Sequence, residues 1–417
     1  LNVRTYMCIL GTTATPISTN QRGTQMNHAD YFDGLTETKL RGAGSRKWTT
    51  YPDAIGAFIA EMDFGTAPEV QAALQEPVGS AALGYAPVTA VDDMTRACSA
   101  WLESVYGWTV PATDIRPIPD VLAGIVLAIT HYSAPGSAIV LPTPAHMPFL
   151  KIPASLNRRI IQVPMTFGAD EWKLDLEGID AAFAAGGGLL IFCNPHNPIG
   201  KVYSRAEMLE LSEIVEKHGA RVCSDEIHAP LVFSSSRHVP YASVSPAAAK
   251  HTVTVASATK AWNMSGLKCA QIIFSNSTDQ HTWSSASFMA EHGVGYLGVL
   301  ATTAAYSEGK PWLDEVITYL DHNRQQLAVL LAEHLPEVRY HAPEGTYLAW
   351  LDCRSLDLGN HPAEFFLENA EVACSDGAGF GDNGAGYLRF NLAMPTPILK
   401  RAVRQMGEAF RKNTAAK

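Results

Sequence analysis

The sequence predicts an α/β protein whose mainly parallel, buried β-sheet lies between helices. Short apolar segments rich in β-branched residues alternate with longer segments of helical periodicity, which is the pattern of strand–helix–strand units. Most of the short segments are uncharged, so we expect both of their faces to be covered. A chain of 417 residues is longer than a single hydrophobic core usually accommodates, so we expect a second, smaller domain.

The expected elements follow one another in a regular order. After an apolar run that ends at Ala60, helices are expected at 68–76, at 92–106 and over the segment VLAGIVLAI. Strands are expected at 138–141, 159–163, 189–193, 221–224, 252–256 and 270–274. Ser204 and Glu207 form a capping box that opens a helix between two of them. The chain closes with a helix at 311–335, strands around 346–352 and 386–392, and a helix at 396–412.

These elements divide the chain into four parts. Residues 26–60 form an arm that we expect to pack against the small domain, and residues 61–310 and 311–417 form the large and the small domain. Residues 1–25 are an ordered extension, a disordered tail or a start-site artefact, with Met26 as an alternative start. They lack a charged segment followed by an apolar core, so no signal peptide is expected.

The composition of the chain excludes some classes of binding partner and indicates the cellular compartment. A net charge of −10 and the absence of Lys/Arg runs argue against nucleic acid and anionic membranes as partners. The longest apolar stretch, Ala181 to Cys193, carries three glycines and is too short to span a membrane. Seven scattered cysteines without a CxxC pair indicate reduced thiols in a cytoplasmic protein. No metal site is expected.

Lys260 is the centre of the candidate site. It follows the expected strand 252–256 in a turn of small residues, Ser257-Ala258-Thr259. The carboxyl ends of strands in an open α/β sheet meet a ligand crevice. Partial desolvation there lowers the pKa of an amine and makes it a nucleophile for aldehydes. The alternative is a solvated surface lysine, and the choice depends on the residues at other strand ends.

Four further polar residues occupy comparable positions. Asp225 closes an apolar strand, where a carboxylate is costly to bury without a cation, although it could instead cap a helix. Asn197 lies in the proline-rich turn NPHNPIG. Asp120 precedes a helix whose free N–H groups form an anion site, or is simply its N-cap. Arg389 lies in an otherwise uncharged strand and either clamps a carboxylate or forms a structural ion pair.

Together these residues supply the parts of a pyridoxal phosphate (PLP) site. Such a site needs an imine-forming amine, a carboxylate that keeps the pyridine nitrogen protonated, a donor to the ring hydroxyl and a cradle for the phosphate. Each part alone is a weak signal. Their combination and their order along the chain favour a PLP-dependent enzyme.

The chain resembles the fold-type I, aminotransferase-like PLP enzymes from about Asn27 to its end, and among them the MalY/PatB-type carbon–sulfur β-lyases, or cystathionine β-lyases. The motifs that carry the resemblance are RGAGSRKW, AEMDF, GY at 84–85, NPHNPIG, SDEIHAPLV, SATKAWNMSGLKCA, EGTYLAWLD and YLRFNLA. The resemblance implies a seven-stranded sheet in the large domain and cleavage of L-cystathionine or related cysteine S-conjugates to thiol, pyruvate and ammonia. A PLP-dependent aminotransferase of class I/II and a regulator that retains PLP are the alternatives.

The resemblance also implies residue roles. Lys260 would carry the cofactor, Asp225 would pair with its pyridinium nitrogen, and Asn197 would bond the ring hydroxyl with His228 nearby. The phosphate would be held by Ser257, Lys268 and the N–H groups of Val121 and Leu122. Arg389 would bind the substrate α-carboxylate. Tyr85 would reach the phosphate of a neighbouring subunit, which implies a homodimer.

Two positions depart from the family pattern. His146 stands where the family usually has a tyrosine that stacks on the ring; it either stacks or only packs. An imidazole titrates near neutrality, so we expect it to make activity sensitive to pH. Asp120 replaces a glycine before the phosphate-binding helix. Because a carboxylate repels phosphate, Asp120 must turn away to cap the helix or be neutralised.

Overall fold

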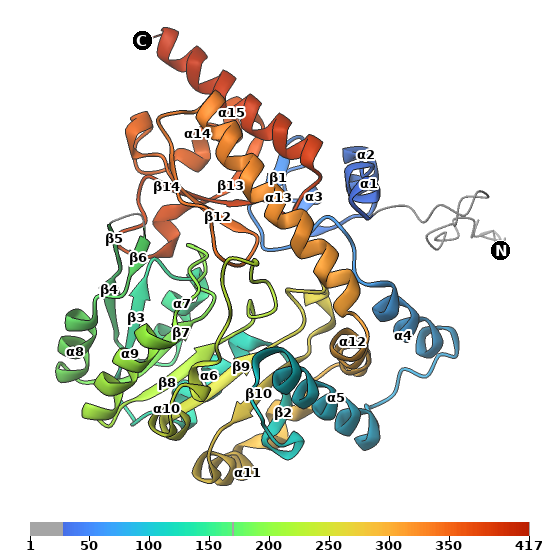
Figure 1. The fold of residues 1–417 in the computed structure, drawn as a ribbon, viewed down its shortest axis with the longest axis vertical. Helices are drawn as coiled ribbons and strands as arrows, with labels where there is room; N and C mark the ends of the chain where they lie inside the picture. Colours follow the sequence, from blue (N-terminus) through green and yellow to red (C-terminus); the bar gives the residue numbers. More distant parts are fainter. Residues whose placement is uncertain (1–27, 169–170, 417) are drawn as a thin grey trace, which may run out of the picture.

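Two large β-sheets, a two-stranded hairpin and the helices packed on them make up the structure, a computed structural model that describes residues 28–168 and 171–416 (Figure 1). The larger sheet has seven strands in the order β2-β10-β9-β8-β7-β3-β4, and β10 runs antiparallel to the other six. The prediction of a mainly parallel sheet between helices is therefore confirmed. The expected extension at 1–25 and the alternative start at Met26 lie outside the described residues.

The larger sheet is buried on both faces. Its strands are β2 (Ile115–Ile118), β3 (Ala138–Thr143), β4 (Ile160–Pro164), β7 (Gly187–Cys193), β8 (Arg221–Asp225), β9 (Thr252–Ala256) and β10 (Ala270–Phe274). Alternate residues of β3 point to opposite helix layers. Ile139 packs with residues of α6 (Val121–His131) and α7 (Met147–Ser155), whereas Val140 packs with residues of α8 (Leu176–Ala184) and α9 (Arg205–Lys217).

Further helices surround this sheet. They are α4 (Pro68–Gly79), α5 (Val88–Trp101), α10 (Pro246–His251), α11 (Ser277–His292) and α12 (Tyr296–Ser307). Helix α5 continues into a π-helical turn over Leu102–Tyr106. The predicted capping box opens α9, because the Ser204 side chain and the Glu207 side chain each accept from the other's backbone N–H.

The smaller sheet joins the two ends of the described chain. Its order is β1 (Ile55–Ala57), β13 (Val372–Asp376), β14 (Tyr387–Asn391), β12 (Leu348–Asp352) and β11 (Arg339–Tyr340). Strand β1 pairs in parallel with β13, so a strand near the N-terminus completes a sheet of C-terminal strands. Helices α14 (Pro362–Ala370) and α15 (Thr396–Ala416) contact β13, and α13 (Lys310–His334) lies beside α15 (Figure 1). The short helices α1 (His28–Asp33), α2 (Glu37–Gly42) and α3 (Arg46–Thr49) precede β1.

Several elements are not predicted by the sequence, and β2 shows why. It contains Pro117, which lacks a backbone N–H and weakens the strand signal. The strand tolerates the proline because it lies at the edge of the sheet and pairs only with β10. Strands β1 and β13, the hairpin β5 (Thr166–Gly168) and β6 (Glu171–Lys173), and helices α1–α3, α7, α8, α10, α11, α12 and α14 are also found only in the structure.

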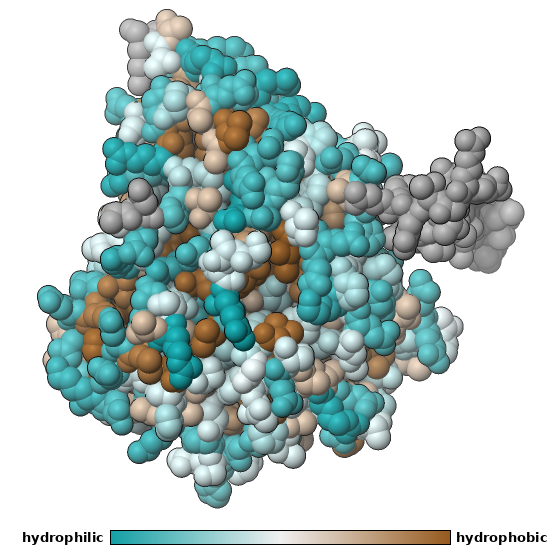
Figure 2. Space-filling model, in the orientation of Figure 1, coloured by the Kyte–Doolittle hydropathy of each residue, from teal (hydrophilic) through white to brown (hydrophobic). Residues whose placement is uncertain are grey.

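The surface is mixed in polarity. On the face shown in Figure 2, apolar residues form separate groups among hydrophilic ones. Across residues 28–168 and 171–416, no helix is both long and apolar enough to cross a membrane.

Candidate active site

The predicted residues meet between the two sheets. Asp225 is the last residue of β8, Lys260 lies in the turn after β9, and Asn197 lies in the loop after β7. Arg389 comes from β14 of the smaller sheet, and its Nη1 donates to Asn197 Oδ1 at 3.2 Å. The structure therefore brings side chains from both sheets to the carboxyl ends of the parallel strands, where α/β proteins bind ligands.

Lys260 has the properties of a reactive amine. Its Nζ donates to the carbonyl oxygen of Ala60 at 2.8 Å. Burial and then the charge of Arg389 lower the pKa of Lys260 to about 8, against the opposing influence of Glu61 and Asp225. A solvated surface lysine does not fit this environment. Near pH 8 about half of the amine is neutral and able to attack a carbonyl.

Asp225 is a buried carboxyl group without a cationic hydrogen-bond partner among the described residues. It is 3% exposed, and its Oδ1 accepts from the backbone N–H of Ile227 at 3.0 Å. It does not cap a helix, because turns follow β8. Burial raises the pKa of Asp225 to about 7, although the Ile227 N–H and the charge of Lys260 act in the opposite direction. A bound cation beside this carboxyl would favour its ionised form.

Arg389 carries a buried charge held by neutral acceptors. Its side chain is 3% exposed, and Nη2 donates to the Phe58 carbonyl at 2.8 Å and to Ser375 Oγ at 3.2 Å. No ion pair of the described chain includes Arg389, and its buried Nε has no hydrogen-bond partner there. Burial lowers the pKa of Arg389 to about 10. A structural ion pair is therefore not its role here, and its free donors suit a carboxylate ligand.

The backbone between β1 and α4 is part of the site, and sequence reasoning missed it. Carbonyl groups of this segment accept from Lys260 and Arg389. Asn391 Nδ2 holds the segment in place by donating to the carbonyls of Ile59 and Glu61, both at 2.7 Å. Backbone acceptors leave no residue-type signal, although the motif AEMDF marks the place in the sequence.

Two histidines near the cluster are neutral. Burial lowers the pKa of His228 to about 3, and its Nδ1 has no hydrogen-bond partner in the described chain. Burial also lowers the pKa of His146 well below its usual range, with the charges of Arg389 and Lys260 acting in the same direction. The prediction that His146 titrates near neutrality is therefore wrong. Its stacking role stays a prediction. Tyr347, whose ring lies 6.2 Å from that of His228, adds a buried hydroxyl that the sequence did not indicate.

The predicted phosphate region contains an ion pair. Asp120 Oδ1 accepts from the backbone N–H of Ala123 at 2.8 Å and caps α6, while Oδ2 accepts from Lys268 Nζ at 2.9 Å. Burial favours the protonated form of Asp120, but the bonds from Lys268 and Ala123 outweigh it and lower the pKa of this carboxyl. Both expected outcomes for Asp120 thus occur together. Ser257 Oγ donates to the Cys269 carbonyl at 2.8 Å, which ties the turn before Lys260 to the residue after Lys268.

Of the remaining predicted residues, two lie at the start of α6 and the third is exposed at the surface. Val121 and Leu122 begin α6, where backbone N–H groups have no intrahelical acceptor. Tyr85 lies in the segment between α4 and α5 and is 88% exposed; its ring is 5.8 Å from that of His292 in α11. No contact within the described chain joins Tyr85 to Lys260.

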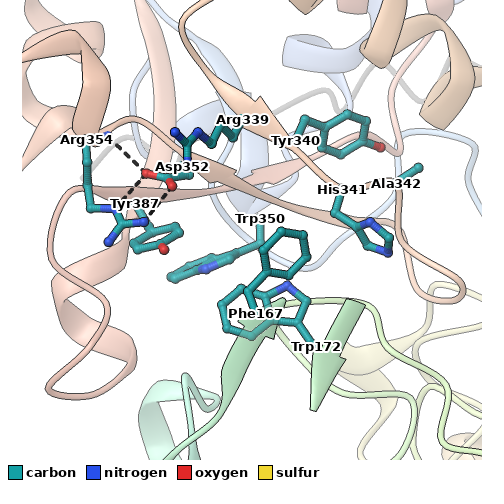
Figure 3. Close-up of a pocket in the computed structure, with 10 residues that line it drawn as sticks. All are labelled: Phe167, Trp172, Arg339, Tyr340, His341, Ala342, Trp350, Asp352, Arg354 and Tyr387. Atoms are coloured by element: carbon teal, nitrogen blue, oxygen red, sulfur yellow. Dashed lines mark hydrogen bonds and ion pairs between the residues drawn. The ribbon is translucent and has the colours of Figure 1, made fainter. Parts of the chain in front are cut away.

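A separate hollow of 660 Å³ lies between the β5–β6 hairpin and the edge of the smaller sheet (Figure 3). Aromatic rings such as Trp350 and Tyr387 line it, and Arg354 pairs with Asp352 there. None of the predicted site residues line it. Trp350 is paired with Arg389 across β12 and β14, so the hollow lies beside the cluster without containing its reactive groups.

The cluster at Lys260 fits the predicted cofactor. It offers an amine of lowered pKa and a buried carboxyl that needs a cation. Orphaned buried polar atoms, His146 Nδ1, His228 Nδ1 and Arg389 Nε, belong to the same cluster. PLP would supply an aldehyde, a ring cation and hydrogen-bonding groups to these partners.

Comparisons with known proteins place the chain among similar sequences and folds. Residues 58–406 match the family described as aminotransferase class I and II. A cystathionine β-lyase of Corynebacterium glutamicum is 40% identical over 90% of this chain and 98% of its own. The cystathionine β-lyase PatB of Bacillus subtilis is 31% identical over 86% of this chain and 92% of its own. The crystal structure of a PLP-bound C–S lyase from Staphylococcus hominis, 29% identical, superposes with a TM-score of 0.86 and covers 92% of this chain and 99% of that one.

Proposed function

Because the chain belongs to the class I and II aminotransferase family, we propose that it is a PLP-dependent carbon–sulfur β-lyase. Its substrates are L-cystathionine or related cysteine S-conjugates, which it cleaves to a thiol, pyruvate and ammonia. The resemblance of its motifs to this family is confirmed by the matches along nearly the whole chain. The observation that carries the proposal is the cluster of Lys260, Asp225 and Arg389 in a chain 40% identical to a cystathionine β-lyase.

Lys260 has two tasks in this proposal. Bound PLP supplies an electron sink that stabilises negative charge at the substrate Cα. The amine of Lys260 holds the cofactor, and its Nζ accepts the proton that leaves Cα. A pKa of about 8 suits a group that must take up and release a proton near neutral pH.

The surrounding residues bind and orient. Asp225 would accept a hydrogen bond from the pyridinium N–H, and the positive charge of the ring would compensate the cost of burying the Asp225 carboxylate. Asn197 uses Oδ1 for Arg389, so its Nδ2 is the group that donates to the ring hydroxyl. Arg389 binds the substrate α-carboxylate with donors that now face only neutral acceptors. His228, neutral at every physiological pH, packs beside them without adding charge.

The nature of the leaving group favours elimination. A thiolate leaves readily from Cβ because the conjugate thiol has a pKa near 8.5, far below that of an alcohol. An aminotransferase would use the same Lys260 proton transfer but would need a keto acid to complete its cycle. The two activities therefore differ in their products and in their need for a second substrate.

Product analysis tests the proposal. The full-length protein is given L-cystathionine without a keto acid, and thiol, pyruvate and ammonia are measured over many turnovers. Stoichiometric release of all three supports the lyase, whereas turnover that requires a keto acid and yields its amino acid supports the aminotransferase. If the protein binds PLP but does not turn over L-cystathionine with or without a keto acid, the result supports a regulator. Borohydride reduction and peptide mapping should place the pyridoxyl group on Lys260, and a label on another lysine would contradict the assignment.

We also propose a homodimer in which Tyr85 reaches the partner's cofactor phosphate. In support, the exposed ring of Tyr85 lies 5.8 Å from that of His292, and the exposed ring of Phe288 stacks on the same histidine at 5.8 Å. Exposed apolar side chains that gather in this way mark interfaces. Mixing inactive Lys260→Ala and impaired Tyr85→Phe subunits should restore part of one site per heterodimer. No recovery after verified subunit exchange would count against the composite site. The six cysteines in the described part are free, which supports our further proposal of a cytoplasmic location.

A further inference from the structure

We propose that Asp120 competes with the cofactor phosphate for Lys268 and for the first turn of α6. The chain would then bind PLP more weakly, and exchange it more readily, than with an uncharged residue at this position. The inference rests on the proposed PLP site, since it assigns a regulatory role to one residue of that site.

The competition follows from the two bonds of one carboxylate. Asp120 Oδ1 accepts from the Ala123 N–H at 2.8 Å, and Oδ2 accepts from Lys268 Nζ at 2.9 Å. A helix N-terminus and a lysine ammonium are the two kinds of group that hold phosphate in proteins. In this structure both are already engaged by a negatively charged side chain.

An ordinary N-cap in the same chain shows the difference. Asp175 caps α8 by accepting from the Gly178 N–H at 2.9 Å, and no ion pair of the described chain includes it. Asp120 makes the equivalent capping bond and adds a cation that reaches it from the segment after Lys260. The second bond is therefore not needed to cap the helix.

The ion pair is accessible to an incoming ligand. The Lys268 side chain is 60% exposed and that of Asp120 is 38% exposed, so a phosphate can approach both from solvent. Lys268 is held close to the cofactor-bearing turn, because its neighbour Cys269 accepts from Ser257 Oγ. A phosphate at the start of α6 would share Lys268 with the carboxylate and lie beside a like charge.

The expected magnitude is moderate. A phosphate monoester carries a charge of about −1.5 to −2 at pH 7. Repulsion between charges a few ångströms apart in a partly exposed site predicts a loss of affinity on the order of tenfold. Because the same carboxylate caps α6, its removal should strengthen cofactor binding while leaving the free protein no more stable.

The experiment measures cofactor affinity directly. Apoprotein of the wild type, Asp120→Asn and Asp120→Gly is titrated with PLP, and the dissociation constant and release rate are followed by absorbance. We expect both variants to bind PLP on the order of tenfold more tightly and to release it more slowly. Pyridoxal, which lacks the phosphate, should bind all three proteins equally. Inorganic phosphate, measured on each apoprotein without PLP, should likewise bind the variants more tightly than the wild type.

The control is Asp175→Asn, which alters an N-cap that forms no ion pair in the described chain and should leave PLP affinity unchanged. Thermal unfolding of each apoprotein verifies that the variants are folded. Equal or weaker PLP binding by folded Asp120→Asn would overturn the inference. Equal binding would show that the carboxylate has no effect on the phosphate, and weaker binding would show that it orients Lys268 for the phosphate. A wild type that fails to bind PLP at all would instead overturn the proposed function.

Discussion

Replacing Asp225 with asparagine should stabilise the cofactor-free protein, and more so as the pH rises. The pKa of Asp225 is about 7 in the folded chain against an ordinary value of 3.8, chiefly because of burial. The folded chain thus holds this proton more tightly than the unfolded chain does. The contribution of Asp225 to stability is fully present below pH 3.8 and is lost as the pH rises through about 7.

The magnitude follows from the two pKa values. Each pH unit between them changes the free energy of unfolding by about 1.4 kcal/mol, so the whole interval corresponds to on the order of 4 kcal/mol. Asparagine keeps the shape and can still accept from the Ile227 N–H, but it carries no charge. Between about pH 5 and 8 the stability of Asp225→Asn relative to wild type should therefore increase by about 2 to 3 kcal/mol.

The assay is urea unfolding of both apoproteins at several pH values. Asp180→Asn is the matched control, since this surface carboxylate pairs with Lys217 and His218, which lower its pKa. That variant should not gain stability as the pH rises. Added PLP should reverse the ranking at pH 8, because its ring cation compensates the Asp225 charge. A stability difference that stays constant from pH 5 to 8 would refute the reasoning, since Asp225 would then be ionised throughout.

Three further predictions concern the site. Incorporation of PLP into the apoprotein should accelerate about tenfold per pH unit below pH 8 and level off above it, because only neutral Lys260 attacks the aldehyde; stopped-flow rates independent of pH would contradict this. Arg389→Gln should lower kcat/KM about 10- to 150-fold through loss of a charged hydrogen bond, and Arg389→Lys should lower it less. Wild-type kcat/KM in both variants would exclude a role for Arg389 in carboxylate binding. His146→Tyr should leave the pH profile unchanged between about pH 5 and 8, because His146 is already neutral; a flattened profile would show that it titrates.

Local sequence patterns were sufficient for most strands and helices around the site. The segment at 252–256 is apolar, short and β-branched, and it forms β9 with those bounds. The capping box at Ser204 and the uncharged segment after Asp120 likewise mark where α9 and α6 begin. These signals are local, because burial of a strand or the start of a helix depends on residues within a few positions. Lys260, Asp225 and Asn197 were found by their place relative to such strands.

By itself the sequence thus determined the α/β class, the order of the main elements and the residues worth testing. Only the tertiary structure decided what charge those residues carry and what they contact. The neutral state of His146, the hydrogen bond from Arg389 to Asn197 and the ion pair of Asp120 with Lys268 depend on groups more than a hundred positions away in the chain. A pKa depends on burial and on charges across the fold, and no local pattern encodes the distance from α6 to Lys268 or from β14 to Asn197.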